Sequence, residues 1–273
     1  MSLDYQGPGV SWKLADGVLE VALHHGACNE LGTPLVSELK HLMRALEQRP
    51  PSLRAMLLHS ELESGFCAGA DLRELHRSLV IRRARGVPLE ELNAELRAFL
   101  DDVHGIFDAL DRAPFVTVAA VHGPAFGGGL ELALVCDIVV ADATARFCLP
   151  ELRLGLIPGF GGLPRLQRDV GNAIIRDLLF TGRSINAERA HTLGLIAQRV
   201  SPGEVLRAAR ALCRQVCRFD PPAVARAKGF LKPRMEAELE REKHLFCELF
   251  FSPAVSEALG KFVERTDLRA YLP

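Results

Sequence analysis

The sequence Pro124-Ala-Phe-Gly-Gly-Gly-Leu-Glu-Leu-Ala-Leu-Val-Cys136 follows the apolar run Phe115–Val121. Three consecutive glycines open a segment that otherwise resembles a helix, although each glycine costs roughly 1 kcal/mol there relative to alanine. Close backbone approach explains such a triplet, because an unpaired N–H at a helix start can contact a negatively charged ligand atom when no Cβ intervenes. Glu131 lies three residues after Gly128, on the same helical face. The pattern predicts an N–H donor beside a carboxylate. The alternative is a strand, turn and helix packed tightly by glycines.

Two further segments have related features. The first, Glu61-Leu-Glu-Ser-Gly-Phe-Cys-Ala-Gly-Ala-Asp71, follows an apolar run and precedes a helical pattern that Asp71 is well placed to cap. Its Ala68-Gly69 pair can present a second backbone N–H, and two such donors converging on one oxygen would form an oxyanion hole. The second, Phe147-Cys-Leu-Pro-Glu-Leu-Arg-Leu-Gly-Leu-Ile-Pro-Gly-Phe-Gly-Gly162, carries Glu151 as a second candidate carboxylate.

Together these segments resemble the enoyl-CoA hydratase/isomerase, or crotonase, superfamily over nearly the whole chain. The resemblance is carried by Phe66-Cys-Ala-Gly-Ala-Asp71, by Gly127-Gly-Gly-Leu-Glu131, and by Pro150-Glu151 with Leu156-Ile-Pro-Gly-Phe-Gly-Gly162. It implies that Ala68 and Gly128 are the oxyanion-hole donors. It also implies that Glu131 and Glu151, 20 residues apart, are the paired acids of the hydratase branch. The substrate-binding residues that it implies are Cys28, Asn29, Cys67, Ala70, Asp71, Leu72, Phe126, Gly127, Gly159 and Phe160.

Composition restricts the class of protein. The 273 residues are 48% hydrophobic and 25% charged, which is ordinary for a soluble globular chain. A net charge of −1 offers no field for nucleic acid or for an anionic membrane. We see no secretory signal at the N-terminus and no apolar run of the ~20 residues that a membrane span needs, so a cytoplasmic location is expected. The seven cysteines are irregularly spaced, which indicates reduced core thiols and no metal site.

Periodicity predicts an α/β fold followed by helices. We expect strands at Gly17–His24, Ala55–Leu58, Phe115–Val121, Ile138–Ala141 and Ala145–Cys148, with a helix at Pro34–Leu46. After residue 203 we expect only helices, at Glu204–Phe219, Pro222–Leu231, Met235–Phe250 and Pro253–Val263. The predicted parts are an active-site core, 1–200, and a helical subdomain, 201–273. The resemblance implies a spiral of ββα units in the core, and a homotrimer or a dimer of trimers built through the helices.

The resemblance implies that the segment 76–100 is longer here than in many members of the family. It contains Arg82-Arg-Ala-Arg85 and then a long helical pattern over Leu89–Leu110. In the family this region borders the acyl pocket, so the segment can set substrate size. For the arginines themselves, the alternative is a solvated, charged turn before a surface helix.

The activity that the resemblance implies is addition of water to a 2-enoyl-CoA. Two nearby, partly desolvated acids can divide the work, one taking a proton from water while the other protonates C2. No cofactor is needed, since coenzyme A is part of the substrate. An acyl carrier protein is an alternative carrier of the acyl group. Asn29 matches a family position near the coenzyme, but no Lys or Arg precedes it, which leaves His25 or Arg73 for the phosphates. Isomerase, decarboxylase, thioester hydrolase and non-catalytic acyl-CoA-binding or RNA-binding roles are the alternatives, although the balanced charge disfavours nucleic acid.

Overall fold

The architecture was derived from a computed structural model, which describes residues 3–264. Its main sheet has seven strands in the order β1-β2-β3-β4-β5-β7-β10. The strands are β1 (Asp4–Gln6), β2 (Val10–Ala15), β3 (Val18–Leu23), β4 (Ala55–Ser60), β5 (Val116–Val121), β7 (Ile138–Asp142) and β10 (Gln198–Val200). The first three pair antiparallel, and all pairs from β3 onward are parallel. The turn between β2 and β3 has two residues at positive φ, Asp16 and Gly17, as a tight hairpin requires.

A second, smaller sheet pairs β8 (Arg146–Cys148) with β6 (Pro124–Phe126) and β9 (Ile185–Asn186). The helices are α1 (Thr33–Glu47), α2 (Leu72–Ala84), α3 (Leu89–Asp111), α4 (Gly128–Leu134), α5 (Gly162–Asp169), α6 (Asn172–Thr181), α7 (Ala187–Thr192), α8 (Val205–Val216), α9 (Pro221–Leu231), α10 (Glu236–Phe250) and α11 (Pro253–Glu264), with a 3₁₀ turn, η1, at Glu151–Leu154. None of the helices within the described residues has the length and the apolar run to cross a membrane.

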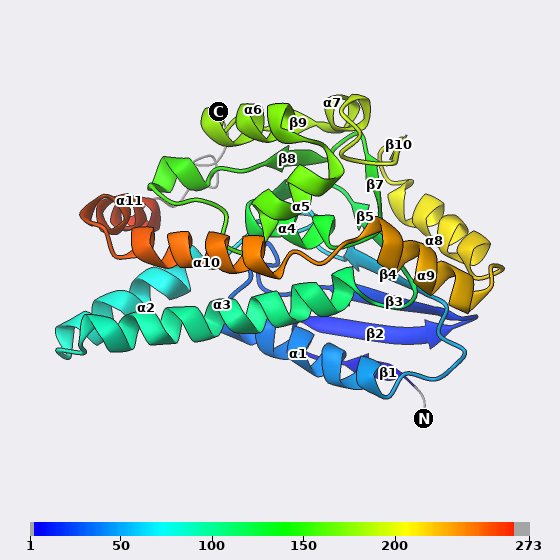
Figure 1. Ribbon diagram of the computed structural model, residues 1–273, viewed down its shortest axis with the longest axis horizontal. Coiled ribbons are helices and arrows are strands. Elements are labelled where there is room, and N and C mark those ends of the chain that lie inside the picture. Colours follow the sequence, from blue (N-terminus) through cyan, green and yellow to red (C-terminus); the bar gives the residue numbers. More distant parts are fainter. Residues whose placement is uncertain (1–2, 265–273) are drawn as a thin grey trace.

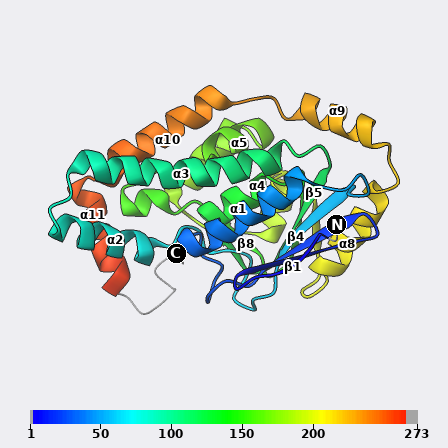
Figure 2. The ribbon, with the colours of Figure 1, turned by 90° about the horizontal axis from the view of Figure 1, so that it is seen from below.

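Both faces of the central parallel strands are covered, which explains their mainly apolar composition. In β4, Ala55 and Leu57 pack with the residues of α8 on one face. Met56 and Leu58 face the larger core, which also contains the buried residues of α1, α3 and α4. Figure 1 shows α8 beside the sheet, whereas α2, α3, α10 and α11 gather at the opposite end of the molecule. Figure 2 shows the same separation from below.

The α/β fold class with a C-terminal run of helices is confirmed. The observed ends of the elements differ from the predicted ends by a few residues. For example, the helix predicted over Glu204–Phe219 ends at Val216, because Asp220 already caps the next helix by accepting from Ala223 N at 3.0 Å. The segment 76–100 lies in a helical hairpin of α2 and α3. The arginines at its tip fit the expected charged turn before a helix, because Arg83 and Arg85 are exposed and residues 85–88 connect the two helices. Arg82 pairs across that hairpin with Glu91 at 2.9 Å and with Glu95. The division into parts 1–200 and 201–273 stays a prediction, and residues 265–273 lie outside the described part of the chain.

Candidate active site

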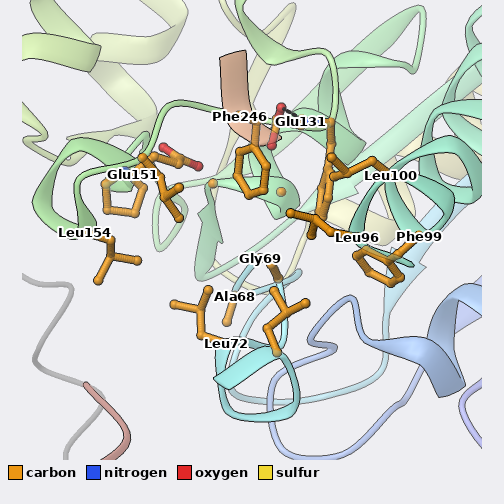
Figure 3. Close-up of a pocket in the computed structure, with 18 residues that line it drawn as sticks. Ala68, Gly69, Leu72, Leu96, Phe99, Leu100, Glu131, Glu151, Leu154 and Phe246 are labelled. Carbon is orange, nitrogen blue, oxygen red and sulfur yellow. Dashed lines mark hydrogen bonds between the residues drawn. The ribbon is translucent and has the colours of Figure 1, made fainter. Parts of the chain in front are cut away.

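A single apolar pocket joins the three segments that the sequence singled out (Figure 3). Its empty space is about 590 Å³ when the solvent at its open mouth is included. Glu131 and Glu151 are the charged side chains in its wall. The remaining lining residues are Ala68, Gly69, Ala70, Leu72, Leu75, Leu96, Phe99, Leu100, Gly127, Gly128, Pro150, Leu154, Leu156, Gly159, Phe160 and Phe246.

Glu131 lies in the first turn of α4 and is only 2% exposed. Its Oε1 accepts hydrogen bonds from the amides of Phe160 and Gly162 at 2.9 and 2.8 Å. Burial raises the pKa of Glu131 to about 7, although those two amides favour the ionised form. Its Oε2 makes no hydrogen bond within residues 3–264, and Glu131 lines the pocket.

Glu151 opens the turn η1, directly after Pro150. Its Oε2 is buried and has no hydrogen-bond partner within residues 3–264. Burial first, and then the nearby charge of Glu131, hold the pKa of Glu151 well above the usual range of a carboxyl group. In Figure 3 the two carboxylates lie on the same side of the pocket, opposite Ala68 and Leu72. The site thus contains two acids whose charged forms are both disfavoured.

The glycine triplet is explained by close packing inside the protein. A Cβ on Gly127, whose φ is +47°, would lie 2.5 Å from Oε1 of Glu151. On Gly128 it would lie 2.7 Å from the Phe160 ring, and on Gly129 2.1 Å from the carbonyl oxygen of Cys67. The tight-packing alternative therefore accounts for all three glycines. It also leaves the amide of Gly128 at a helix start, where no intrahelical acceptor exists.

The expected oxyanion-hole donor Ala68 requires correction. Its amide donates to the carbonyl of Cys28 at 2.9 Å, so that N–H is already used. On the same loop, Leu31 binds the carbonyl of Gly69 and the amide of Asp71, at 2.7 and 3.2 Å. The amide of Ala70 lies between these two bonds and is directed away from Leu31, because successive N–H groups of an extended segment alternate in direction.

Within the described residues, the Ala70 amide has no hydrogen-bond acceptor. The loop also lies against the start of α4, since a Cβ on Gly69 would be 3.3 Å from the amide nitrogen of Gly128. Ala70 and Gly128 thus have unoccupied amides on two neighbouring segments of the pocket wall. The sequence prediction named Ala68 on this loop, whereas the amide that is unoccupied in the structure is that of Ala70.

Comparison with known proteins places the chain in a family. A family model for Enoyl-CoA hydratase/isomerase matches residues 13–269. The chain belongs to this family. It is similar to a probable enoyl-CoA hydratase of Rhizobium meliloti, 33% identical over 88% of each chain. It is also similar to a short-chain-enoyl-CoA hydratase of Clostridium acetobutylicum, 31% identical over 90% of each chain. The fold matches the crystal structure of an enoyl-CoA hydratase from Bacillus halodurans with a TM-score of 0.81 at 24% identity, covering 92% of this chain and 99% of that one.

The residues expected to bind substrate in this crotonase-family protein separate into two groups. Ala70, Leu72, Gly127, Gly159 and Phe160 line the pocket. The others lie outside the lining and support the loops around the pocket. They are Cys28, Asn29, Cys67, Asp71 and Phe126.

Asn29 shows how these supporting residues act. It is fully buried at a φ of +52°, and its side chain accepts from His25 N at 2.7 Å. The same side chain donates to Ser60 Oγ at 2.8 Å and to Phe66 O at 3.0 Å. Cys67 donates its thiol to Asn29 O at 2.9 Å, and burial raises the pKa of that thiol to about 12. Neither side chain is free to contact a substrate.

Asp71 caps α2 by accepting from the amide of Glu74 at 2.8 Å, as its position in the sequence suggests. Of the residues considered for the coenzyme phosphates, Arg73 lies 3.8 Å from Glu30. A role for Arg73 or His25 there stays a prediction. Among residues 3–264, no group of three or more His, Cys, Asp and Glu is arranged to hold a metal ion.

Sequence reasoning missed Glu242 and Arg165. Glu242 comes from α10 and accepts from the amides of Gly161 and Leu163 at 2.6 and 2.8 Å. Arg165 is completely buried and pairs with Asp108 at 2.6 Å. A signal for Glu242 was present, because it follows Leu239 by three residues and precedes Phe246 by four, on the apolar face of its helix. A charged residue on such a face usually has a buried partner.

Proposed function

We propose that this protein adds water across the 2,3 double bond of a 2-enoyl-CoA. The observation that supports the proposal is that two buried glutamates and two residues with unoccupied amides, Ala70 and Gly128, line one apolar pocket in a chain of the enoyl-CoA hydratase/isomerase family. Addition of hydroxide to C3 moves an electron pair to the thioester oxygen, and protonation at C2 then completes the reaction. The site must therefore stabilise an enolate and move two protons.

The amides of Ala70 and Gly128 are the proposed donors to the thioester oxygen. Their hydrogen bonds to that oxygen are strongest when it becomes negative. They therefore lower the activation barrier more than they tighten substrate binding. Loss of one such donor typically slows a reaction about 10²-fold to 10³-fold. The geometry favours this pair over one that includes Ala68, whose amide is engaged by Cys28.

Glu131 is the proposed base and Glu151 the proposed acid. Two backbone amides stabilise the ionised form of Glu131, which can then take a proton from the attacking water. Glu151 has a buried oxygen without a partner and a pKa raised well above normal, which favours its protonated form as the donor to C2. Because the two acids repel each other when both are charged, the pair with a single proton is the favoured state near neutral pH.

The acyl group is proposed to be a short, uncharged hydrocarbon. The pocket wall beyond the two acids consists of Leu, Phe, Ala, Gly and Pro residues. A second carboxylate on the substrate would be buried there without a partner, at a cost that disfavours dicarboxylic substrates. The similar Clostridium acetobutylicum protein carries a name with the same preference, a short-chain-enoyl-CoA hydratase. A cytoplasmic location and a trimeric or hexameric assembly stay predictions.

Crotonyl-CoA hydration tests the proposal. The absorbance of the enoyl thioester should fall when the protein is added. We expect Glu131→Gln and Glu151→Gln each to lose about 10²-fold or more in kcat, because each removes a proton-transfer group. Both variants should still bind acyl-CoA in a calorimeter. Unchanged rates in both variants would eliminate the two-acid mechanism, and conversion of a 3-enoyl-CoA without hydration would favour an isomerase.

A further inference from the structure

The loop that holds Glu131 is also held by a second buried carboxylate. The amides of Phe160 and Gly162 donate to Glu131 Oε1. The intervening amides, of Gly161 and Leu163, donate to Glu242 Oε1 and Oε2. Four consecutive N–H groups therefore alternate between two carboxylates, one from α4 and one from α10. We call this arrangement the 160–163 clamp.

The clamp is closed from the carbonyl side as well. Arg165 Nη1 donates to the carbonyl oxygens of Phe160 and Gly161, at 3.1 and 3.2 Å. The exposed fraction is 0% for Arg165 and 4% for Glu242, so water does not compete for these bonds. A Cβ on Gly161 would lie 2.0 Å from Arg165 Nη1, and one on Gly162 would lie 2.8 Å from Glu131 Oε1. The loop cannot shift without losing several buried bonds together.

From this geometry we infer that Glu242 is a positioning residue for Glu131. It holds the 160–163 clamp so that the amides of Phe160 and Gly162 bind only Oε1 of Glu131, while Oε2 is left for the reacting water. Glu242 does not line the pocket, so it acts through the loop and not on the substrate. Its effect on turnover rests on the proposed function, whereas its effect on the loop does not.

The test uses Glu242→Gln, which keeps the shape of the side chain but replaces one acceptor oxygen with an NH₂ group. That group would face a backbone N–H, so one of the two bonds is lost. We expect kcat for crotonyl-CoA to fall about tenfold or more with KM within about twofold, since the substrate contacts remain. Glu238→Gln makes the same chemical change at an exposed position of the same helix and should match the wild type.

A double-mutant comparison separates positioning from general destabilisation. If Glu242 acts through Glu131, then adding Glu242→Gln to Glu131→Gln should lower the residual rate by less than about twofold. A full tenfold loss in that background would contradict the inference, because it would mean that Glu242 acts independently of Glu131.

Hydrogen exchange of the backbone amides, followed by NMR, gives a readout that needs no turnover. In Glu242→Gln all four amides of residues 160–163 should exchange faster, including the two that bind Glu131. Faster exchange of Gly161 and Leu163 alone, with unchanged kcat, would overturn the inference.

If Glu242→Gln does not fold, Glu242→Asp replaces it, since an aspartate is one methylene shorter and cannot reach both amides. The wild-type protein could hydrate no enoyl-CoA while Glu242→Gln still shows faster exchange of all four amides. That result would refute the proposed function and would still support the role of Glu242 in holding the loop.

Discussion

At the scale of single residues, Glu131 is placed where a negative charge is unfavourable. Its pKa of about 7 in the folded protein compares with a reference value of 4.5. Between those values the folded protein keeps the proton while the unfolded chain releases it, so the free energy of unfolding falls as pH rises through this range. Above pH 7 the loss reaches about 3 kcal/mol.

Glu131→Gln removes the carboxyl group, and with it this fall in the free energy of unfolding at high pH. We expect this variant to be more stable than the wild type at pH 8, with the difference disappearing toward pH 4, even though its hydration rate is greatly reduced. Urea unfolding at both pH values measures the change, with the exposed Glu238→Gln as the control. Equal stability of wild type and variant at pH 8 would mean that Glu131 is better solvated than the geometry indicates.

Two glycines in helices should respond oppositely to the same substitution. Gly129→Ala brings a Cβ to 2.1 Å from the carbonyl oxygen of Cys67, a backbone atom that cannot rotate away. We expect a loss of about 1–3 kcal/mol or more, as for other overpacked sites. Gly105→Ala, on the exposed side of α3 with nothing within 4 Å, should gain about 0.5–1 kcal/mol from helix propensity. Thermal or urea unfolding distinguishes the two, and similar losses at both sites would contradict the packing argument.

At the scale of elements, the α2–α3 hairpin forms one wall of the acyl pocket. Leu75, Leu96 and Phe99 line this pocket and also line a second cavity. They therefore separate the two spaces. Beyond them, the second cavity is lined by the apolar side chains of Leu79, Leu92 and Phe250. Polar residues also line it, namely Thr33, Glu74, Ser78 and Glu95.

Opening this partition should change the preferred acyl length. We expect Leu96→Ala and Phe99→Ala to raise kcat/KM for a ten-carbon enoyl-CoA about tenfold relative to crotonyl-CoA, because the extra methylenes gain buried contacts. Leu79→Ala lines only the second cavity and should leave the ratio at its wild-type value. If the partition variants keep the wild-type ratio while still hydrating crotonyl-CoA, the chain does not extend in this direction.

The sequence predicted the central strands and the long helices, but it did not predict the strands β1, β2, β6, β9 and β10 or the details of the loops. Apolar runs such as Val116–Val121 and the amphipathic pattern of α3 identify strands and helices, because burial imposes the period. Which amide of the Ala68–Ala70 loop faces the pocket depends on its pairing with Leu31, which no local pattern encodes. Local pattern therefore does not distinguish Ala68, whose amide is engaged, from Ala70, whose amide is unoccupied.

At the scale of the whole molecule, the site is assembled from distant parts of the chain. Glu242 reaches the loop of Gly161 from 81 residues away, and His104 Nε2 bonds Gly159 O at 2.8 Å across 55 residues. The sequence predicted the fold class and both pocket acids, because these are tied to short segments. It could not predict the supporting residues on α3 and α10, because their roles depend on how helices far apart in sequence pack over the loop.

A crystal structure of Glu151→Gln with 3-hydroxybutanoyl-CoA tests the central claim most directly, since this ester is the product of crotonyl-CoA hydration. The account predicts the thioester oxygen within hydrogen-bond distance of the amide nitrogens of Ala70 and Gly128, with the 3-hydroxyl group at Glu131. A thioester oxygen bound elsewhere, or a hydroxyl group remote from Glu131, would contradict it.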